Sequence, residues 1–157
     1  MRGSLGVFGL GLGLGLAKGV FGAHLFTPPV PHVAGHWLLL AVLLEVKRVE
    51  YYNSIRSPDQ AQEYMHVIWK YLLDVWKAET GSSMSVEEME KWKFCAITSC
   101  PQQDNGFDCG VFVCAFSLCL THGVHENTFT QEDMPFFREH IALSIQEGRL
   151  TTFLTYP

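Results

Sequence analysis

QQDNGFDCG occupies residues 102–110, and this polar, turn-forming stretch ends where a long apolar run begins. Residues 111–120 are hydrophobic on every side, which predicts a buried central helix that ends near His122 and Gly123. Cys109 lies just ahead of that helix, where unpaired backbone N–H groups and the positive end of the helix dipole stabilise a thiolate. The stretch therefore predicts a nucleophilic cysteine at the start of a buried helix.

The neighbours of Cys109 favour a reactive thiol over a structural one. Gly106 and Gly110 allow a substrate to approach the backbone closely, and Asp108 can cap the start of the helix. A free cysteine without such neighbours is more commonly a small buried hydrophobe. We keep that interpretation, core packing, for the remaining cysteines, which are Cys95, Cys100, Cys114 and Cys119.

The cysteine pattern indicates neither a metal site nor a disulfide framework. Cys109, Cys114 and Cys119 recur every five residues, so on a helix turning about 100° per residue they point about 140° apart and cannot share one ion. The cysteine count of five is odd, and no pair has Cys-x-x-Cys spacing. Reduced thiols of a nuclear or cytoplasmic protein fit this pattern, and we expect no cofactor.

Strands and a long helix are predicted before this stretch. Residues 36–44 are almost continuously apolar and predict a buried strand, followed by a polar turn and a partner strand at 49–53. Residues 57–60 have the cap, proline and glutamine of a helix start, and apolar residues follow at helical spacing as far as residue 76. Residues 93–99 predict another short strand.

A last helix is predicted near the C-terminus. Thr130 can cap it, Glu132 and Asp133 suit its first turn, and Gly148 ends it. Mixed strands and helices without regular alternation predict an α+β fold. The apolar stripe of this helix is expected to contain Met134, Phe137, Ile141 and Ile145.

Composition favours one domain and a protein or peptide partner. The chain has 157 residues, 48% of them hydrophobic, which is enough for one substantial core. The net charge is −5 and the eleven basic residues are spread thinly, which argues against nucleic acid as the main ligand. We expect a monomer that does not associate with membranes.

Residues 1–24 differ from the rest of the chain. Residues 5–17 largely alternate glycine with leucine or another apolar residue, a run too short to span a membrane. No persuasive cleavage site follows, so a secretory signal peptide is the less favoured interpretation. Frequent glycine weakens a strand as much as a helix. We therefore expect residues 1–24 to be an irregular leader and residues 25–157 to be the folded part.

Three segments together resemble a known family. Residues 102–112, QQDNGFDCGVF, resemble the nucleophile motif of the SUMO-specific (sentrin-specific) proteases, the cellular relatives of the adenovirus protease. HW at 36–37, which leads to YYNS at 51–54, and FTQEDM at 129–134 agree with the same family in the same order. The resemblance implies an adenovirus-protease-like α+β fold, with a small central sheet flanked by helices and the N-terminal part of the catalytic domain missing.

The same resemblance assigns catalytic roles. It implies that Cys109 is the nucleophile, that His36 is the general base, and that Gln103 is an oxyanion-hole donor through its side-chain amide. A histidine takes the thiol proton, the thiolate attacks the scissile carbonyl, and N–H donors stabilise the oxyanion. Asn53 stands where the family usually has an aspartate that orients the histidine, and an amide supplies no negative charge for the imidazolium. Weakened activity is therefore expected.

Three substrate-binding residues are also expected. The resemblance implies that Trp37 lines the narrow channel for the Gly-Gly tail of the modifier, and Gly106 and Asp108 lie beside the nucleophile. The implied function is a cysteine peptidase or isopeptidase that removes SUMO or a related ubiquitin-like modifier from conjugates or precursors. The alternatives are an impaired or truncated family member that only binds a ubiquitin-like protein, and a fragment that does not fold independently.

Overall fold

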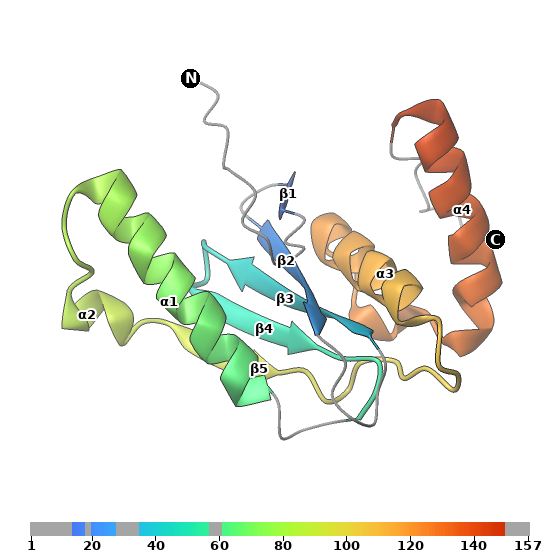
Figure 1. Cartoon of the computed structure of the whole chain (residues 1–157), viewed down its shortest axis with the longest axis horizontal. Coiled ribbons are helices and arrows are strands. Elements are labelled where there is room, and N and C mark those ends of the chain that lie inside the picture. Colours follow the sequence, from blue (N-terminus) through green and yellow to red (C-terminus); the bar gives the residue numbers. More distant parts are fainter. Residues whose placement is uncertain (1–13, 18–19, 28–34, 57–60, 150–157) are drawn as a thin grey trace.

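The computed structural model describes residues 14–17, 20–27, 35–56 and 61–149. Within these residues a five-stranded sheet of order β1-β2-β3-β4-β5 has α1 on one face and α3 on the other, with α4 packed outside α3 (Figure 1). The strands are β1 (Leu14–Ala17), β2 (Val20–Thr27), β3 (His36–Leu43), β4 (Arg48–Tyr52) and β5 (Lys93–Ala96). The helices are α1 (Ala61–Thr80), α2 (Val86–Met89), α3 (Cys109–His122) and α4 (Met134–Glu147), with 3-10 turns η2 (Glu126–Thr128) and η3 (Gln131–Asp133).

β3 and β4 form the predicted hairpin. They pair antiparallel, with Leu39 opposite Tyr52. Their turn is closed by the Lys47 N–H, which donates to the Leu44 carbonyl over 3.3 Å, and Lys47 takes a φ of 50°. β5 pairs with β4 in parallel, which confirms a short strand at the start of residues 93–99. The α+β prediction is thus confirmed.

Both faces of β3 are covered, and this explains its continuously apolar sequence. On one face Leu40 packs in a core that includes Met65 of α1. On the other face Leu39 shares a core with Phe112 and Phe116 of α3. Leu40 and Phe112 are completely buried. The hairpin is therefore fixed from two sides, and so are the side chains at its ends.

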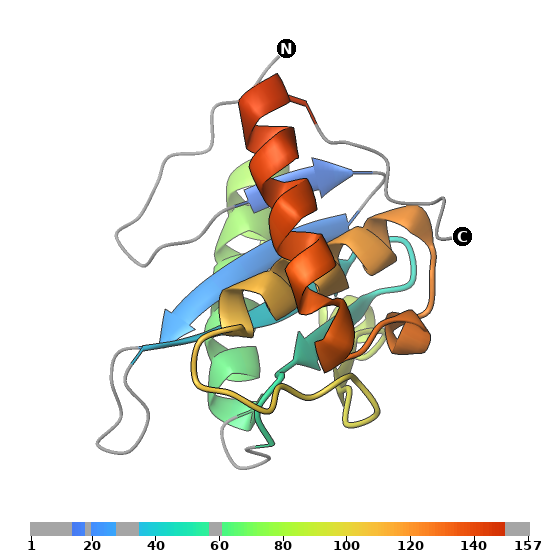
Figure 2. The same ribbon diagram turned by 90° about the vertical axis from the view of Figure 1, so that its right-hand side faces the viewer.

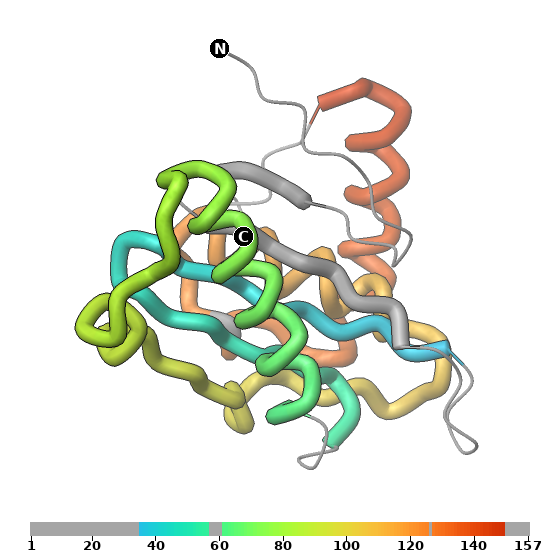
Figure 3. Tube along the Cα trace, turned by 60° about the vertical axis from the view of Figure 1, so that its left-hand side comes forward, coloured from blue at the N-terminus to red at the C-terminus, as the bar shows by residue number. Residues whose placement is uncertain are grey.

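α1 confirms the long helix expected before the central stretch. It has 20 residues and lies against the sheet (Figure 3). Its buried residues are Ala61, Met65 and Ile68. The cap expected at residues 57–60 lies outside the described residues. No helix in the described ranges combines the length and the apolar character needed to cross a membrane.

α3 confirms the buried helix predicted at residues 111–120. It begins two residues earlier, so Cys109 is its first residue, and it ends at Gly123, which takes the left-handed conformation with a φ of 66°. Cys119 is buried, as expected for core packing. Cys114 is exposed, so the packing prediction is wrong there. The reason is that Cys114 faces a groove beside α4 rather than the sheet.

α4 starts one short turn after its predicted cap. Thr130 and Asp133 form a reciprocal capping box around η3, and α4 follows directly. Met134 and Phe137 are buried, but Ile145 is 76% exposed, so the predicted apolar stripe is wrong at its C-terminal end. The last turns of α4, which include Ile145, run past α3 (Figure 2).

β1 and β2 lie where the sequence predicts an irregular leader up to residue 24. β2 pairs antiparallel with all of β3, from Thr27 opposite His36 to Val20 opposite Leu43. Backbone pairing of this kind requires no side-chain pattern, so a glycine-rich sequence does not reveal it. The structure differs from the expectation at these two strands. Residues 1–13 lie outside the described part, and a domain boundary at residue 24 stays a prediction.

Candidate active site

His36 and Asn53 meet at one end of the β3–β4 hairpin. His36 is the first residue of β3, and Asn53 follows the last residue of β4, so antiparallel pairing brings both to the same end of the sheet. The His36 Nε2 lies 2.7 Å from the Asn53 Oδ1, and each residue is 7% exposed. The structure thus joins two of the residues that the sequence selected.

The hydrogen bonds of Asn53 fix the direction of its amide. Its Oδ1 also accepts the Ile55 N–H over 2.9 Å, while its Nδ2 donates to the Tyr51 hydroxyl over 2.8 Å. The atom that faces His36 is therefore an acceptor, and the Nε2 of the histidine must donate to it. In this tautomer the Nδ1 of His36 is the nitrogen that can accept a proton.

His36 is tuned toward its neutral form. Burial lowers the pKa of His36 below its usual value, and the hydrogen bond to Asn53 counters this only in part. A carboxylate at position 53 would stabilise the imidazolium by its charge, which an amide cannot do. The site therefore holds a neutral imidazole that is suited to act as a base.

Cys109 is the first residue of α3, and the start of this helix lies close to the start of β3. Cys109 is 5% exposed at that position. A Cβ added at Gly110, the next residue, would lie 3.7 Å from Cδ1 of Trp37, which follows His36 on β3. Trp37 also packs against the core between the sheet and α3. The start of α3 and the start of β3 are therefore neighbours, and they carry the predicted nucleophile and base.

Gln103 is anchored to the segment that follows Asn53. Its backbone N–H donates to the Ser54 carbonyl over 2.8 Å, and its Oε1 accepts the Ser54 hydroxyl over 2.6 Å. Its Nε2 donates to the Asn105 carbonyl, which engages one of its two N–H groups. The oxyanion role expected of Gln103 thus depends on the second N–H.

Four residues that the sequence analysis did not select also make hydrogen bonds at the site. Gln102 donates through its Nε2 to the carbonyls of Asn53 and Cys100, each over 3.0 Å. The Cys100 thiol also donates to the Asn53 carbonyl, over 3.4 Å. The doubled glutamine at 102–103 and the YYNS run were visible in the sequence, but their contacts depend on tertiary structure. The residues missed are Tyr51, Ser54, Cys100 and Gln102.

Asp108 does not cap α3. It stands at the cap position, but its side chain makes no capping hydrogen bond and is 3% exposed. Its carboxylate instead accepts hydrogen bonds from Asn105, Gln131 and Arg138. Burial alone would raise the pKa of Asp108, but these three donors hold it below its usual value. The cap prediction is therefore wrong, because the carboxylate is engaged inside the loop, and contact of Asp108 with substrate stays a prediction.

Gly106 lies in an open part of the same loop. A Cβ added at Gly106 would have no atom within 4 Å, and the neighbouring Phe107 is 72% exposed. The Arg138 guanidinium lies 5.9 Å from the centre of the Phe107 ring. Space for a substrate backbone exists here, and binding by Gly106 stays a prediction.

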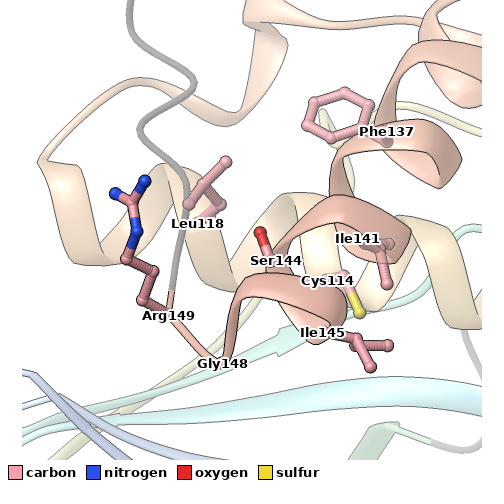
Figure 4. A pocket seen from close by; sticks show the side chains of 8 residues that line it. All are labelled: Cys114, Leu118, Phe137, Ile141, Ser144, Ile145, Gly148 and Arg149. Atoms are coloured by element: carbon pink, nitrogen blue, oxygen red, sulfur yellow. The ribbon is translucent and has the colours of Figure 1, made fainter.

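Two hollows lie near these elements. A groove of about 420 Å³ between α3 and α4 is lined by Cys114 (Figure 4). The residue is exposed to solvent, but the apolar side chains of the groove partly desolvate its thiol, which raises the pKa of Cys114. The groove contains none of the predicted catalytic residues. A second hollow, of about 430 Å³, is lined by Asn53 and by its neighbours Tyr51 and Gln102. In the described residues no three His, Cys, Asp or Glu side chains gather in a way that could hold a metal ion.

Comparison with known proteins identifies the family of the chain. Residues 23–151 match the model of the Ulp1 protease family, C-terminal catalytic domain. Human sentrin-specific protease 5 is 34% identical over 132 residues, which is 83% of this chain and 16% of the relative. The sentrin-specific protease of Caenorhabditis elegans is 27% identical over 132 residues, again 83% of this chain and 18% of the relative. The chain thus spans less than a fifth of these relatives.

A solved structure shows the same fold. The C-terminal Ulp1 protease domain in complex with Smt3, the yeast ortholog of SUMO, matches with a TM-score of 0.62 at 22% identity. The match covers 85% of this chain and 54% of that one. Because the family model covers most of the sequence, including the segments that contain Cys109, His36 and Asn53, the chain belongs to the Ulp1 protease family.

Proposed function

We propose that the chain is a cysteine peptidase or isopeptidase that removes SUMO or a related ubiquitin-like protein. Cys109 is the nucleophile, His36 the general base, Asn53 the residue that orients the base, and Gln103 an oxyanion donor. One observation carries the proposal. The buried 2.7 Å contact between His36 and Asn53 fixes the tautomer of a neutral histidine beside the start of α3.

The mechanism follows from the tautomer. The Nδ1 of His36 takes the proton of the Cys109 thiol, and the thiolate attacks the carbonyl carbon of the terminal glycine of the modifier. The second N–H of Gln103 and the backbone N–H of Cys109 stabilise the oxyanion. His36 then returns the proton to the leaving amine as a thioester forms. A water deprotonated by His36 hydrolyses the thioester, which releases a carboxylate and restores the thiol.

The substrate side of the proposal rests on Trp37 and Gly106. Trp37 is half-buried against Gly110, at the junction between the predicted base and nucleophile. An aromatic wall at that junction and an open glycine at position 106 suit a narrow substrate tail without side chains, as in Gly-Gly. Trp37 and Gly106 are therefore proposed to contact the tail near Cys109.

The proposal includes a reducing compartment, the nucleus or the cytoplasm. The five cysteines, all within the described residues, are free thiols. A thiol nucleophile needs its reduced form, and such compartments maintain it. The chain is proposed to act there as a monomer on protein conjugates, with no role for nucleic acid or membranes.

The test is covalent capture. The purified chain is incubated with SUMO bearing a C-terminal electrophile, and we expect an adduct that Cys109→Ala abolishes. Cys114→Ala is the matched control, because Cys114 is an exposed thiol outside the site, and it should leave the adduct unchanged. A panel of other ubiquitin-like proteins identifies the modifier. Absence of any adduct from folded protein at neutral pH contradicts the proposal, and binding without an adduct indicates the alternative of a binding-only protein.

A further inference from the structure

We propose that Arg138 and Gln131 are positioning residues, which hold the nucleophile loop (residues 103–108) through Asp108 and so align the oxyanion donors. The inference rests on the proposed peptidase function. It starts from the buried carboxylate of Asp108, directly before the nucleophile. That carboxylate binds two side chains that come more than twenty residues later in the chain.

The first contact that holds the loop is an ion pair between Asp108 and Arg138 of α4, made through two nitrogens of the guanidinium. The Arg138 Nε donates to the Asp108 Oδ1 over 3.0 Å, and its Nη2 forms an ion pair with the same oxygen. The Nη2 also lies 3.5 Å from the Phe107 carbonyl, and the guanidinium lies over the Phe107 ring. A planar guanidinium can hold backbone, ring and carboxylate at once, which a lysine cannot.

The second anchor, from η3, holds both ends of the loop. The Gln131 Nε2 donates to the Asp108 Oδ2 over 2.8 Å, and its Oε1 accepts the Asp104 N–H over 3.1 Å. One amide thus joins residues that lie four positions apart in the loop. The side chain of Gln131 therefore holds Asp104 and Asp108 together, in addition to the hydrogen bonds within the loop.

The hydrogen bonds continue from Asp108 to the proposed oxyanion donors. Asn105 donates through its Nδ2 to the Asp108 Oδ2 over 2.7 Å, and its Oδ1 accepts the N–H groups of Phe107 and Asp108. The Asn105 carbonyl in turn accepts the Nε2 of Gln103. Asp108 is therefore linked to Gln103 through the side chain and the backbone carbonyl of Asn105, and by one peptide bond to the N–H of Cys109. Small displacements of such donors cost much activity, because they act on a developing charge at short range.

This role differs from general stabilisation. Arg138 has a side chain that is 49% exposed, and without it the buried Asp108 carboxylate keeps its hydrogen bonds from Asn105 and Gln131. Its loss should therefore loosen the loop and leave the fold intact. Arg149 provides a matched control, since it is an exposed arginine just after α4 that pairs with Glu147 and makes no described contact with the loop.

The experiment compares Arg138→Ala, Arg138→Lys, Gln131→Ala and Arg149→Ala. For Arg138→Ala we expect kcat on a SUMO conjugate to fall by about 10- to 100-fold, with KM changed by less than about 2-fold. Alkylation of Cys109 by iodoacetamide, followed by peptide mapping, should change by less than about 2-fold, since that reaction forms no oxyanion. Arg138→Lys and Gln131→Ala should give intermediate losses, and Arg149→Ala none.

A readout without substrate separates this inference from the proposed function. Amide hydrogen exchange at residues 104–109 should be faster in Arg138→Ala than in the unmodified chain, and unchanged in Arg149→Ala. If the unmodified chain has no turnover, faster exchange still supports the anchoring role while the proposed function fails. Unchanged exchange in Arg138→Ala, or wild-type kcat in that variant, overturns the inference.

Discussion

The hydrogen-bond partner of His36 is the amide of Asn53, and this contact bears on the proposed chemistry of the site. Asn53 accepts from His36 and from Ile55, and donates to Tyr51, so it fixes the tautomer without adding charge. Burial keeps the pKa of His36 low, which disfavours the imidazolium that a thiolate needs beside it. Asn53 therefore orients His36 but adds no negative charge that would stabilise the imidazolium.

Asn53→Asp should therefore strengthen the site. The new carboxylate can accept from His36 and Ile55 with one oxygen, and from the rotated Tyr51 hydroxyl with the other. Its charge raises the pKa of His36, so the thiolate–imidazolium pair should form at a lower pH. We expect kcat/KM at neutral pH to rise by about 10-fold or more, since the reverse change in a related triad costs far more than that.

The measurement is the pH dependence of Cys109 alkylation together with that of kcat/KM. Asn53→Ala is the control, because it removes the orienting acceptor without adding charge, and it should lower kcat/KM. An unchanged pH profile in Asn53→Asp would show that the His36–Asn53 contact does not control the thiol.

Some residues of the site could be predicted from the sequence and others could not. Cys109 and Gln103 lie in one short motif, and His36 and Asn53 lie at the same end of one hairpin. The family resemblance selected all four, and their catalytic roles stay predictions. The internal role of Asp108 depends on Arg138, which is 30 residues away and not visible from spacing. The cap prediction for Asp108 was wrong for that reason, since a distant cation outcompeted the helix N–H groups.

At the scale of elements, α3 has two tasks that meet in one helix. Its first turn carries Cys109, while its middle turns fill the core beneath the sheet. Phe116 is 1% exposed and lies 5.3 Å from the Tyr52 ring and 5.4 Å from the Phe129 ring, measured between ring centres. This packing holds the helix axis, and with it the position of the thiol, against β3 and β4.

Phe116→Ala should therefore destabilise the whole chain, by about 3–5 kcal/mol. Phe107→Ala is the matched control, since Phe107 is 72% exposed, and it should change the free energy of unfolding by less than about 0.5 kcal/mol. Urea denaturation followed by circular dichroism measures both values. Equal effects of the two substitutions would show that α3 does not depend on the ring cluster.

Apolar runs in the sequence predicted the strands and the helix that are buried on most sides. Most residues of β3, β4 and α3 are buried or partly buried, so their apolar runs carry a clear signal. α4 is covered only over its first turns, and its apolar stripe therefore failed at Ile145. β1 and β2 are held by backbone pairing in a glycine-rich segment, which no side-chain pattern reveals.

At the scale of the whole molecule, the sheet depends on β2. β3 is central only because β2 pairs with all eight of its residues. Without β2, β3 would become an edge strand with unpaired N–H and C=O groups, and its buried side chains would lose cover at that edge. His36 stands at the end of β3 that pairs with Thr27, so loss of β2 should also disturb the base.

Two truncations test this dependence. Removal of residues 1–19 deletes β1 but keeps β2, and we expect a cooperative thermal transition and retained capture by the SUMO electrophile. Removal of residues 1–27 deletes both strands, and we expect loss of the cooperative transition, association in solution and loss of capture. Calorimetry, size-exclusion chromatography and the adduct assay measure these outcomes. The chain without residues 1–27 could instead unfold cooperatively at the temperature of the full chain. In that case β2 is dispensable, and the β3–β4 hairpin with α1 and α3 is sufficient to hold the site.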